Sequence, residues 1–482
     1  MGTFEEIVEN NLKAVSEFKD QGINPYGGKF ARTGSVKEYV ENYEEGKSVE
    51  LAGRITAIRD HGKTKFFDLK DETEKIQLYL KKGVYPEDKF EIIKKLSVGD
   101  FMGIKGELLK TRTGEITVKV TDFTLLSKAI RPLPEKWHGL KDIEARYRQR
   151  YLDLISNDDV KNVFVKRITI IKAIREYLDD LGCMEVETPM MQSVPGGALA
   201  RPFKTFHNAL DADLYLRIAP ELFLKRLLVG GFEKIYEINR NFRNEGLSKK
   251  HNPEFTMLEI YIAYDDYVGM MELCEKIIKH AAGAIGVEGK LTFNSCEIDI
   301  FAEWEKITYM DALKKYAGID EKCELEDLQK KAKELGIDDV SKKDKFILFN
   351  DIFEDKVEPN LIQPTFVLDY PKALCPLAKV SAKNPEITER FELFVAGSEI
   401  ANAYSELNDP VEQKERFERQ VASIDQKEFG EKKVDYDYVN ALEYGMPPAG
   451  GLGIGIDRLV MLLTSSESIK DVILFPQLRP QA

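Results

Sequence analysis

The sequence predicts an α+β protein in which a small N-terminal β-barrel is followed by a larger unit of mixed helices and strands. Its 482 residues, 43% of them hydrophobic, are enough to bury more than one core. Short runs in which apolar and polar residues alternate fill residues 49–126, whereas helical spacing of apolar residues begins near residue 164. These two patterns predict separate domains.

The first 48 residues are expected to form a helical segment. They begin with an acidic amphipathic stretch, FEEIVENNLKAV, that lacks the basic and apolar regions of a secretion signal. No apolar run in the chain reaches the roughly 18 residues of a membrane span. The five cysteines form no CxxC pair and have no paired histidine spacing, which argues against a zinc site and a disulfide framework. A reduced cytoplasmic protein without a membrane segment is therefore expected.

Residues 49–128 are predicted to form a five-stranded barrel. The strand-like runs are VELAGRITAIRD, KFFDLKD, KIQLYL, DFMGIKGELLK and GEITVKVTDFTLL, each bounded by turns rich in Gly, Asp or Lys. A barrel of five short strands is most simply an OB-fold. The chain's net charge of −13 argues against a nucleic-acid partner, but residues 50–128 contain 16 Lys and Arg against 13 Asp and Glu. The charge distribution leaves such a partner open.

A proline-containing connector separates the barrel from the larger unit. The stretch KAIRPLPEKWHGL is stiffened by two prolines, which predicts a linker over 129–145. An amphipathic helix is then expected, because apolar residues recur at steps of three and four and Gly182 ends the pattern. Its apolar stripe consists of Phe164, Ile168, Ile171, Ile174 and Leu178. Residues 146–482 are predicted to form one α+β domain, with a helical insertion at about 300–360.

The segment 232–264 is the first candidate for chemistry, since two strand-like runs flank a polar loop in it. Such a loop could present Arg243, Glu245, His251 and Phe255 to one pocket. Arginine offers a fork for a phosphate, histidine a second cation or donor, and phenylalanine a flat face for a base. A solvated charged hairpin explains the same residues equally well.

Two acidic residues form a second candidate, in FELFVAGSEIANAYSELND. Glu392 and Glu399 are seven residues apart, close enough on adjacent turns or strands to share a hard cation. Magnesium bound with polyphosphate typically takes one or two protein carboxylates and fills its other positions with substrate oxygens. Spacing alone favours the alternative, an acidic helix surface.

A glycine-rich segment, AGGLGIGIDRLVMLL, is the third candidate. It runs from a strand pattern directly into an apolar helix that carries Arg458. Gly451, Gly453 and Gly455 would let the backbone approach a ligand closely. Tight packing of the helix on the strand would require the same glycines.

Taken in order, these segments resemble the signature sequences of class II aminoacyl-tRNA synthetases, and in detail the bacterial-type lysyl-tRNA synthetase family. EVETPM with its preceding helix is similar to motif 1, FRNEGLSKKHNPEFTMLE to motif 2 and GLGIGIDRLVM to motif 3. The resemblance extends from about residue 50 to the end. It implies an antiparallel catalytic sheet flanked by helices, an OB-fold anticodon domain, and a homodimer formed through motif 1.

The implied reaction is the ATP-dependent activation of L-lysine followed by its transfer to tRNA(Lys). By position, Arg243 would hold the α-phosphate and the lysine carboxylate, while Phe255 and Arg458 would sandwich the adenine. Arg243 and Arg458 are thus the implied catalytic residues. The other implied contacts of ATP are Glu245, His251 at the terminal phosphates, Asn252 and Glu392. Glu392 and Glu399 match the magnesium ligands of the family, which binds up to three ions per subunit.

Lysine selectivity is implied by carboxylates at the far end of a deep pocket. The resemblance assigns Glu259, Tyr261 and Glu406 to the ε-ammonium, and Glu221 and the Gly197 carbonyl to the α-ammonium. Asn402 would join Arg243 at the carboxylate. The implied lysine-binding set is completed by Tyr404, where relatives often carry phenylalanine, and Gly453.

In the barrel, the resemblance assigns four residues to the anticodon. Phe66 would stack on a uridine and Gln77 would bind its edge, with Arg59 and Glu115 nearby. Because neighbours on a strand face opposite ways, one of Phe66 and Phe67 is expected in the barrel core.

Three rival functions fit parts of this pattern. An aspartate or asparagine synthetase shares the domain arrangement, but Glu221, Glu259 and Glu406 favour a cationic substrate. A paralogue that modifies a protein lysine would lack the anticodon domain. A non-catalytic tRNA-binding protein would be expected to have lost Arg243, Glu399 or Arg458, which are all present.

Overall fold

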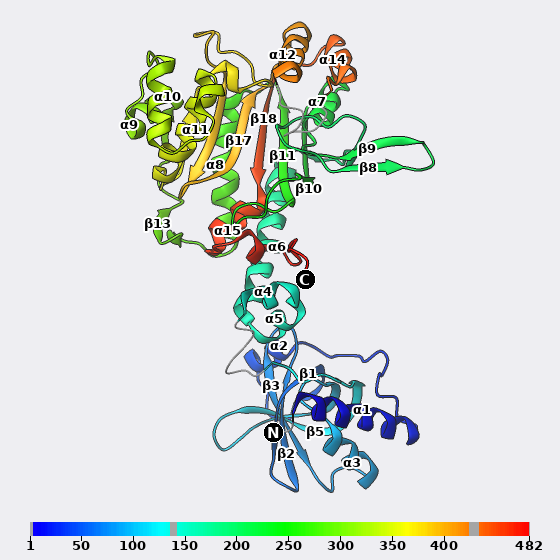
Figure 1. Cartoon of the computed structure of the whole chain (residues 1–482). Helices are drawn as coiled ribbons and strands as arrows, with labels where there is room; N and C mark the ends of the chain where they lie inside the picture. Colours follow the sequence, from blue (N-terminus) through cyan, green and yellow to red (C-terminus); the bar gives the residue numbers. More distant parts are fainter. Residues whose placement is uncertain (1–2, 135–141, 424–432, 482) are drawn as a thin grey trace. The chain divides into compact units, whose positions relative to one another are not determined.

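The computed structural model describes residues 3–134, 142–423 and 433–481. The chain divides into two compact units, Met1–Leu140 and Lys141–Ala482 (Figure 1). The predicted linker at 129–145 contains residues 135–141, which lie outside the described residues.

The first unit is built on a closed barrel with the strand order β1-β2-β3-β5-β4. Alternate residues of each strand point inward, so Leu51, Phe67, Leu78 and Val118 are fully buried in one core. The predicted five-stranded barrel is thus confirmed. Its strands are β1 (Ser48–Asp60), β2 (Thr64–Lys70), β3 (Lys75–Lys81), β4 (Phe101–Lys110) and β5 (Ile116–Ser127).

Three helices accompany the barrel: α1 (Phe4–Asp20), α2 (Val36–Glu41) and α3 (Glu87–Lys95). A capping box begins α1, in which the Thr3 hydroxyl accepts from the Glu6 backbone and the Glu6 carboxylate accepts from the Thr3 backbone. The apolar side of α1 packs into the barrel core, because this core contains Phe18. The expected N-terminal helix is α1.

The second unit contains an eight-stranded sheet with the order β14-β15-β16-β17-β18-β11-β10-β6. Its neighbouring strands are antiparallel except for the parallel pairs β14–β15 and β10–β6 at the two edges. The strands are β6 (Met184–Glu185), β10 (Lys234–Phe242), β11 (Glu254–Ala263), β14 (Glu305–Thr308), β15 (Thr365–Leu368), β16 (Arg390–Val395), β17 (Ser398–Ser405) and β18 (Ala449–Gly455). This is the antiparallel sheet that the resemblance implied.

Helices α6 (Asp158–Asp180), α8 (Tyr267–Ala284) and α15 (Ile456–Thr464) share a large apolar core with one face of the sheet. The other face is left for a pocket. In the predicted apolar stripe of α6, Phe164, Ile174 and Leu178 are buried and Ile171 is partly buried, whereas Ile168 is 67% exposed. A helical period alone does not distinguish burial in the chain's own core from exposure on a second apolar face.

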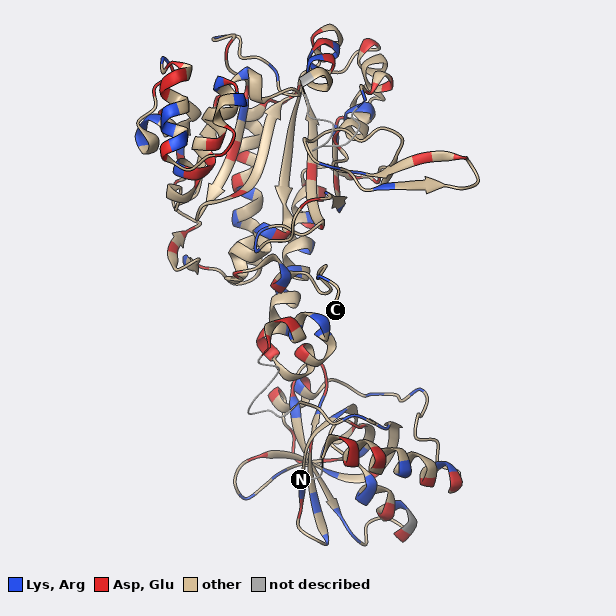
Figure 2. Cartoon of the chain, in the orientation of Figure 1, with Lys and Arg blue, Asp and Glu red and all other residues tan. Residues whose placement is uncertain are grey.

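A helical insertion was predicted at about 300–360. The segment between β14 and β15, which covers most of this range, is mainly helical. Its helices are α9 (Tyr309–Ala317), α10 (Leu325–Glu334), η1 (Val340–Lys342), α11 (Lys345–Ile352), η2 (Phe353–Val357) and η3 (Glu358–Asn360). They form an apolar cluster of their own around Tyr309, Leu348 and Phe353. In α10 the acidic Glu326 and Asp327 lie in the first turn and Lys331 and Lys333 in the last, and Figure 2 shows both charges on this helical segment.

The second unit also contains helices and short strands that are not part of this sheet. A hairpin of β8 and β9 extends away from it (Figure 1). These elements are α4 (Ile143–Arg148), α5 (Arg150–Ser156), β7 (Met191–Gln192), β8 (Lys204–His207), β9 (Ala212–Leu216), α7 (Glu221–Val229), β12 (Lys290–Phe293), β13 (Cys296–Asp299), η4 (Lys372–Leu374), α12 (Pro410–Ser423), α14 (Tyr436–Glu443) and α16 (Ile469–Val472). Within the described ranges, no helix combines the length and apolar character needed to cross a membrane.

Candidate active site

A cavity of about 1940 Å³ is lined by residues from β11, β16, β17 and β18, by α7 and by the loop that joins β10 to β11. Successive residues of a strand face opposite sides of the sheet. The strand residues that alternate with the buried apolar residues of the core therefore point into the cavity. It is lined by nearly all the residues predicted for the catalytic unit: Gly197, Glu221, Arg243, Glu245, His251, Asn252, Phe255, Glu259, Tyr261, Glu392, Glu399, Asn402, Tyr404, Gly453 and Arg458. The β10–β11 segment thus contributes residues to a cavity, while Glu245 and His251 in its loop are also exposed to solvent.

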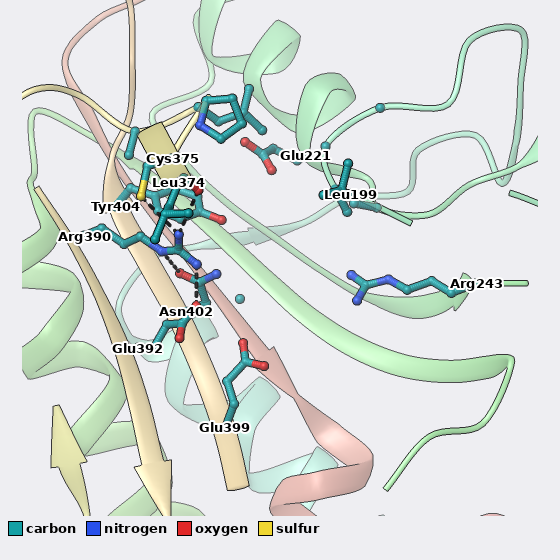
Figure 3. A pocket seen from close by; sticks show the side chains of 18 of the residues that line it. Leu199, Glu221, Arg243, Leu374, Cys375, Arg390, Glu392, Glu399, Asn402 and Tyr404 are labelled. Atoms are coloured by element: carbon teal, nitrogen blue, oxygen red, sulfur yellow. Dashed lines mark hydrogen bonds and ion pairs between the residues drawn. The ribbon is translucent and has the colours of Figure 1, made fainter. Parts of the chain in front are cut away.

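Arg243 follows β10 and points into the cavity from the side opposite Glu399 (Figure 3). Its guanidinium carbon lies 5.1 Å from the centroid of the Phe255 ring. The Arg243 Nε is buried and has no hydrogen-bond partner in the part of the chain that the structure describes. Burial lowers the pKa of Arg243, but a guanidinium keeps its charge at neutral pH. A buried cation with an unused N–H group is suited to binding an anion.

Arg458, in the first turn of α15, forms a second cationic group. Its Nη1 donates to the Glu399 backbone oxygen at 2.8 Å and to the Glu399 carboxylate at 3.1 Å. Its Nη2 lies 3.1 Å from the Nε2 of His251. Burial and the nearby Arg458 charge lower the pKa of His251, so the imidazole is neutral at pH 7 and accepts from Arg458. The loop thus supplies a neutral histidine rather than a second cation.

Glu392 and Glu399 lie on the antiparallel strands β16 and β17. Their spacing of seven residues arises from a tight turn with a bulge in the pairing after Leu393, so the helix-surface alternative is wrong. The Tyr370 hydroxyl donates to Glu392 at 2.7 Å, and Arg390 forms an ion pair with it. Burial and repulsion from Glu399 raise the pKa of Glu392.

Two carboxylates that face one cavity fit the donor set of a magnesium ion held with phosphates. In the described part of the chain, no group of three or more His, Cys, Asp and Glu side chains is arranged to hold a metal. A metal here would therefore take its remaining ligands from a substrate or from water.

The register of three strands places the lysine-pocket residues in two rows. Glu259 on β11, Gly453 on β18 and Asn402 on β17 are direct neighbours in one row. The next row consists of Tyr261, Gly451 and Tyr404. The Tyr261 hydroxyl donates to Glu259 at 3.0 Å. Burial, together with the charge of Glu221, raises the pKa of Glu259 to about 8.

Glu221 and Glu406 meet at the deep end of the pocket, on either side of Lys225. The Lys225 Nζ donates to Glu221 at 2.5 Å and forms an ion pair with Glu406. Glu406 itself lies just behind the cavity wall, where a Cβ at Gly451 would collide with its Oε1. Glycine is required at Gly197 as well, because its φ is +85° and a Cβ would lie 3.0 Å from that of Glu221.

Sequence reasoning missed Lys225 and Asp457. Lys225 stands in the apolar run ELFLKRLLV, and its only sequence signal is the spacing of four residues from Glu221. The buried Asp457 accepts at 2.6 Å from both Arg167 and the Thr256 backbone. It ties the start of α15 to α6 and β11.

Asn252 has a different environment from the other predicted nucleotide residues. Its amide donates to the Glu254 carbonyl at 2.6 Å and accepts from the Gln477 backbone at 3.3 Å. Both polar ends of the side chain are thus engaged within the protein. Asn252 fixes the β10–β11 loop, whereas Glu245 in the same loop is exposed to the cavity.

The four residues predicted for the anticodon lie together on the outside of the barrel. Phe66 pairs across the sheet with Arg59 on one side and Tyr79 on the other. The Gln77 amide donates to Glu115 at 3.1 Å, and Arg59 pairs with Asp68 at 2.5 Å. Phe67 is fully buried in the core, so the expectation that one of the two phenylalanines belongs to the core is confirmed. Tyr79, with its ring centroid 5.4 Å from that of Phe66, extends this surface and was not predicted.

Comparison with known families gives two matches. Residues 142–479 match the family described as tRNA synthetases class II (D, K and N), and residues 49–126 match the OB-fold nucleic acid binding domain. The chain is also similar to proteins named lysine–tRNA ligase. That of Carboxydothermus hydrogenoformans is 53% identical, over 99% of this chain and 98% of the relative. That of Syntrophomonas wolfei subsp. wolfei is 54% identical with the same coverage, and that of Clostridium novyi is 50% identical over 99% and 95%.

Proposed function

The chain belongs to the class II tRNA synthetases of the aspartate, lysine and asparagine group, and we propose that it is a lysine–tRNA ligase. It activates L-lysine with ATP, releases pyrophosphate, and transfers the lysine to the 3′ end of tRNA(Lys). The observation that carries this proposal is a pocket lined by Arg243, Glu221 and Glu259, with the buried carboxylate of Glu406 against Gly451 in its wall. Lysine has the complementary charges, one carboxylate and two ammonium groups.

An aspartate substrate fits this pocket poorly. A second carboxylate would need an unpaired cation at the deep end. The cations found near there, Lys225 and Arg390, are already paired with Glu221 and Glu406 and with Glu392. The charge of the pocket thus supports lysine over the acidic amino acid of the same family group.

The geometry favours exchanging two of the implied roles within the pocket. The α-ammonium and the carboxylate of lysine share one carbon, so the α-ammonium must lie close to Arg243. Glu221 and Glu406 both contact the Nζ of Lys225, so these two carboxylates lie at the same end of the pocket. Glu259 is the carboxylate of the three whose charge also acts on the pKa of Arg243. We therefore assign the α-ammonium to Glu259, and the ε-ammonium to Glu221 and Glu406 at the deep end with Tyr261.

Catalysis in this arrangement depends on positioning and electrostatics. Arg243 would hold the lysine carboxylate beside the α-phosphate, with Asn402 at the same carboxylate, and neutralise charge as pyrophosphate leaves. Arg458 would bind the nucleotide from the opposite side, with His251 accepting from its guanidinium. Glu392 and Glu399 would hold magnesium, which when bound supplies positive charge to the phosphates. No side chain needs to act as a nucleophile.

The test of this function is ATP–pyrophosphate exchange with each of the twenty amino acids in turn, with magnesium and without tRNA. Exchange that depends on lysine alone would support both the reaction and the pocket. Exchange with aspartate or asparagine would overturn the specificity, and no exchange with any amino acid would favour a non-catalytic tRNA-binding protein. Charging of tRNA(Lys) in a second assay completes the test.

The KM for lysine is expected to depend on pH. The pKa values of Glu259 and Glu406 are raised to about 8 by burial, in both cases with a contribution from Glu221. A lysine cation binds the ionised carboxylates, so below pH 8 its binding must displace protons. The KM for lysine should fall by about tenfold or more between pH 6.5 and pH 8.5, whereas the KM for ATP should change little. A lysine KM that is constant over this range would contradict the assignment of these carboxylates.

The outer face of the barrel is proposed to bind the anticodon. Replacing Phe66 with alanine removes a ring on which a base would stack, and such stacking is worth about 1–3 kcal/mol per base. We expect the KM for tRNA(Lys) in aminoacylation to rise at least about fivefold, with lysine-dependent exchange unchanged. Tyr26→Ala, which removes another exposed aromatic ring of the same unit, is the matched control. Equal losses in charging and exchange would contradict the assignment.

We propose a homodimer formed through motif 1. The supporting observation is apolar exposure on this segment, where Val165 is 50% and Ile168 67% exposed on α6, with Met184 and Met191 exposed beyond it. Equilibrium sedimentation should give twice the chain mass of 55.0 kDa, and a single-chain mass would contradict the proposal. We also place the enzyme in the cytoplasm, which cell fractionation can test.

A further inference from the structure

A buried ammonium group of the protein occupies the deep end of the lysine pocket. Lys225 is fully buried, and its Nζ contacts Glu221 Oε1 and Glu406 Oε2. Neither the proposed reaction nor the predicted site uses this lysine. A lysine is rarely buried completely, and here it contacts two carboxylates already assigned to the substrate.

Each carboxylate gives one oxygen to Lys225 and keeps the other. Glu406 Oε1 is buried and has no hydrogen-bond partner among the residues described, and it lies against Gly451, which lines the cavity. Glu221 Oε2 lies on the side of Gly197, 3.6 Å from where a Cβ of that residue would stand. The two remaining oxygens are thus on the cavity side of the ion pair.

The charges of the pocket also balance only when Lys225 is counted. Glu221, Glu259 and Glu406 carry three negative charges when ionised, and Lys225 reduces them to two. Lysine brings two ammonium groups, while its carboxylate is matched by Arg243. Without Lys225, two buried carboxylates would lie side by side with no cation, and one of them would retain a proton.

We propose that Lys225 is a positioning residue for amino-acid selection, which holds Glu221 and Glu406 so that one oxygen of each is directed at the ε-ammonium of the substrate. This inference rests on the proposed lysine–tRNA ligase function. Lys225 is suited to the role because it links α7, where it stands one turn after Glu221, to Glu406 at the end of β17. A cross-link between helix and sheet fixes the distance between the two carboxylates.

The ionisable groups that face this ion pair come from several elements. Apart from Lys225, the cation in this group is Arg390, and it is paired with Glu392 and not with Glu406. The groups are Glu221 on α7, Glu259 and Tyr261 on β11, Arg390 on β16, Tyr404 on β17 and Tyr438 on α14. Lys225 is therefore the cation that favours the ionised form of Glu406, and its removal would raise the pKa of Glu406 further.

The test is ATP–pyrophosphate exchange with Lys225→Met, which keeps the apolar stem and removes the charge. Wild-type protein is assayed first, since failure to respond to lysine would refute the proposed function and not this inference. The variant is expected to raise the KM for lysine at least about tenfold while the KM for ATP stays the same. Its lysine KM should continue to fall above pH 8.5, because Glu406 holds its proton to higher pH. Lys276→Met, at an exposed lysine of α8, is the control and should behave as wild type.

A neutral analogue separates positioning from general damage to the pocket. 6-Hydroxynorleucine has a hydroxyl in place of the ε-ammonium, so its inhibition of exchange should be nearly equal in wild type and variant. An equal loss of lysine and analogue binding, or a lysine KM and pH curve like those of wild type, would overturn the proposal.

A second pair of variants covers the case in which Lys225→Met does not fold. The double variant Glu221→Gln and Lys225→Met lacks one of the two carboxylates that would have no cation in Lys225→Met. It is compared with the single variant Glu221→Gln. In the single variant Lys225 still holds Glu406, so the double variant is expected to have the higher lysine KM. Equal KM values in the two variants would overturn the proposal.

Discussion

Replacing Arg243 with alanine is expected to lower kcat/KM for lysine-dependent ATP–pyrophosphate exchange by about 10³-fold or more. In the proposed reaction Arg243 contacts both reactants, and its Nε has no hydrogen-bond partner among the described residues. A charge that is buried and already oriented stabilises the developing phosphate charge without reorganisation of solvent. The loss should appear mainly in kcat, because the interaction strengthens as pyrophosphate leaves.

Two further variants make the Arg243 experiment decisive. Arg243→Lys keeps the charge but not the planar fork, so it should recover only part of the lost rate. Arg32→Ala, at an exposed arginine of the barrel unit, should exchange at the wild-type rate. A tenfold or smaller loss in Arg243→Ala, with kcat unchanged, would mean that the residue contributes to binding and not to the reaction.

The second large effect is expected at the proposed magnesium ligands. Glu399→Gln should lower exchange by about 10²-fold at ordinary magnesium concentrations and shift the magnesium dependence to higher concentration. Glutamine keeps the size of the side chain and an oxygen for the Arg458 contact, but it removes the negative charge that a hard cation requires. The measurement is the exchange rate as a function of magnesium at fixed ATP.

A substitution at Glu399 tests the proposed magnesium site more clearly than one at Glu392 on the adjacent strand. Removing the Glu392 charge would leave the buried Arg390 without its ion-pair partner, so a loss of activity would have two causes. Glu272→Gln, at an exposed glutamate of α8, is the matched control. If Glu399→Gln has the same magnesium midpoint as wild type, Glu399 does not hold the ion.

The sequence predicted features that follow from local periodicity or from short motifs. The five barrel strands were correct because alternation over several residues is a strong signal. The placement of Phe66 and Phe67 on opposite faces followed from the same geometry, although only the structure shows that Phe67 is the buried one. The junction between β18 and α15 could be predicted because a strand pattern ends at Gly455 and a helix pattern begins directly after it.

Other features depend on contacts between distant parts of the chain. Whether Glu392 and Glu399 share a cavity depends on a hairpin with a bulge, and a spacing of seven is equally compatible with a helix. Lys225 could not be identified because its partner Glu406 lies 181 residues further along the chain. The apolar stripe of α6 could be predicted, but the exposure of Ile168 could not, because a helical stripe does not reveal how wide the buried face is.

The environment of Asp457 has a consequence for how the enzyme moves. This single carboxylate accepts from Arg167 of the motif 1 helix and from Thr256 of the motif 2 strand, while it stands in the motif 3 helix itself. Displacement of any one of the three segments would break a buried hydrogen bond to the other two. The positions of the three segments are thus coupled to one another through this carboxylate. The conformational entropy of arranging the catalytic groups is then lost mainly when the chain folds, before any substrate binds.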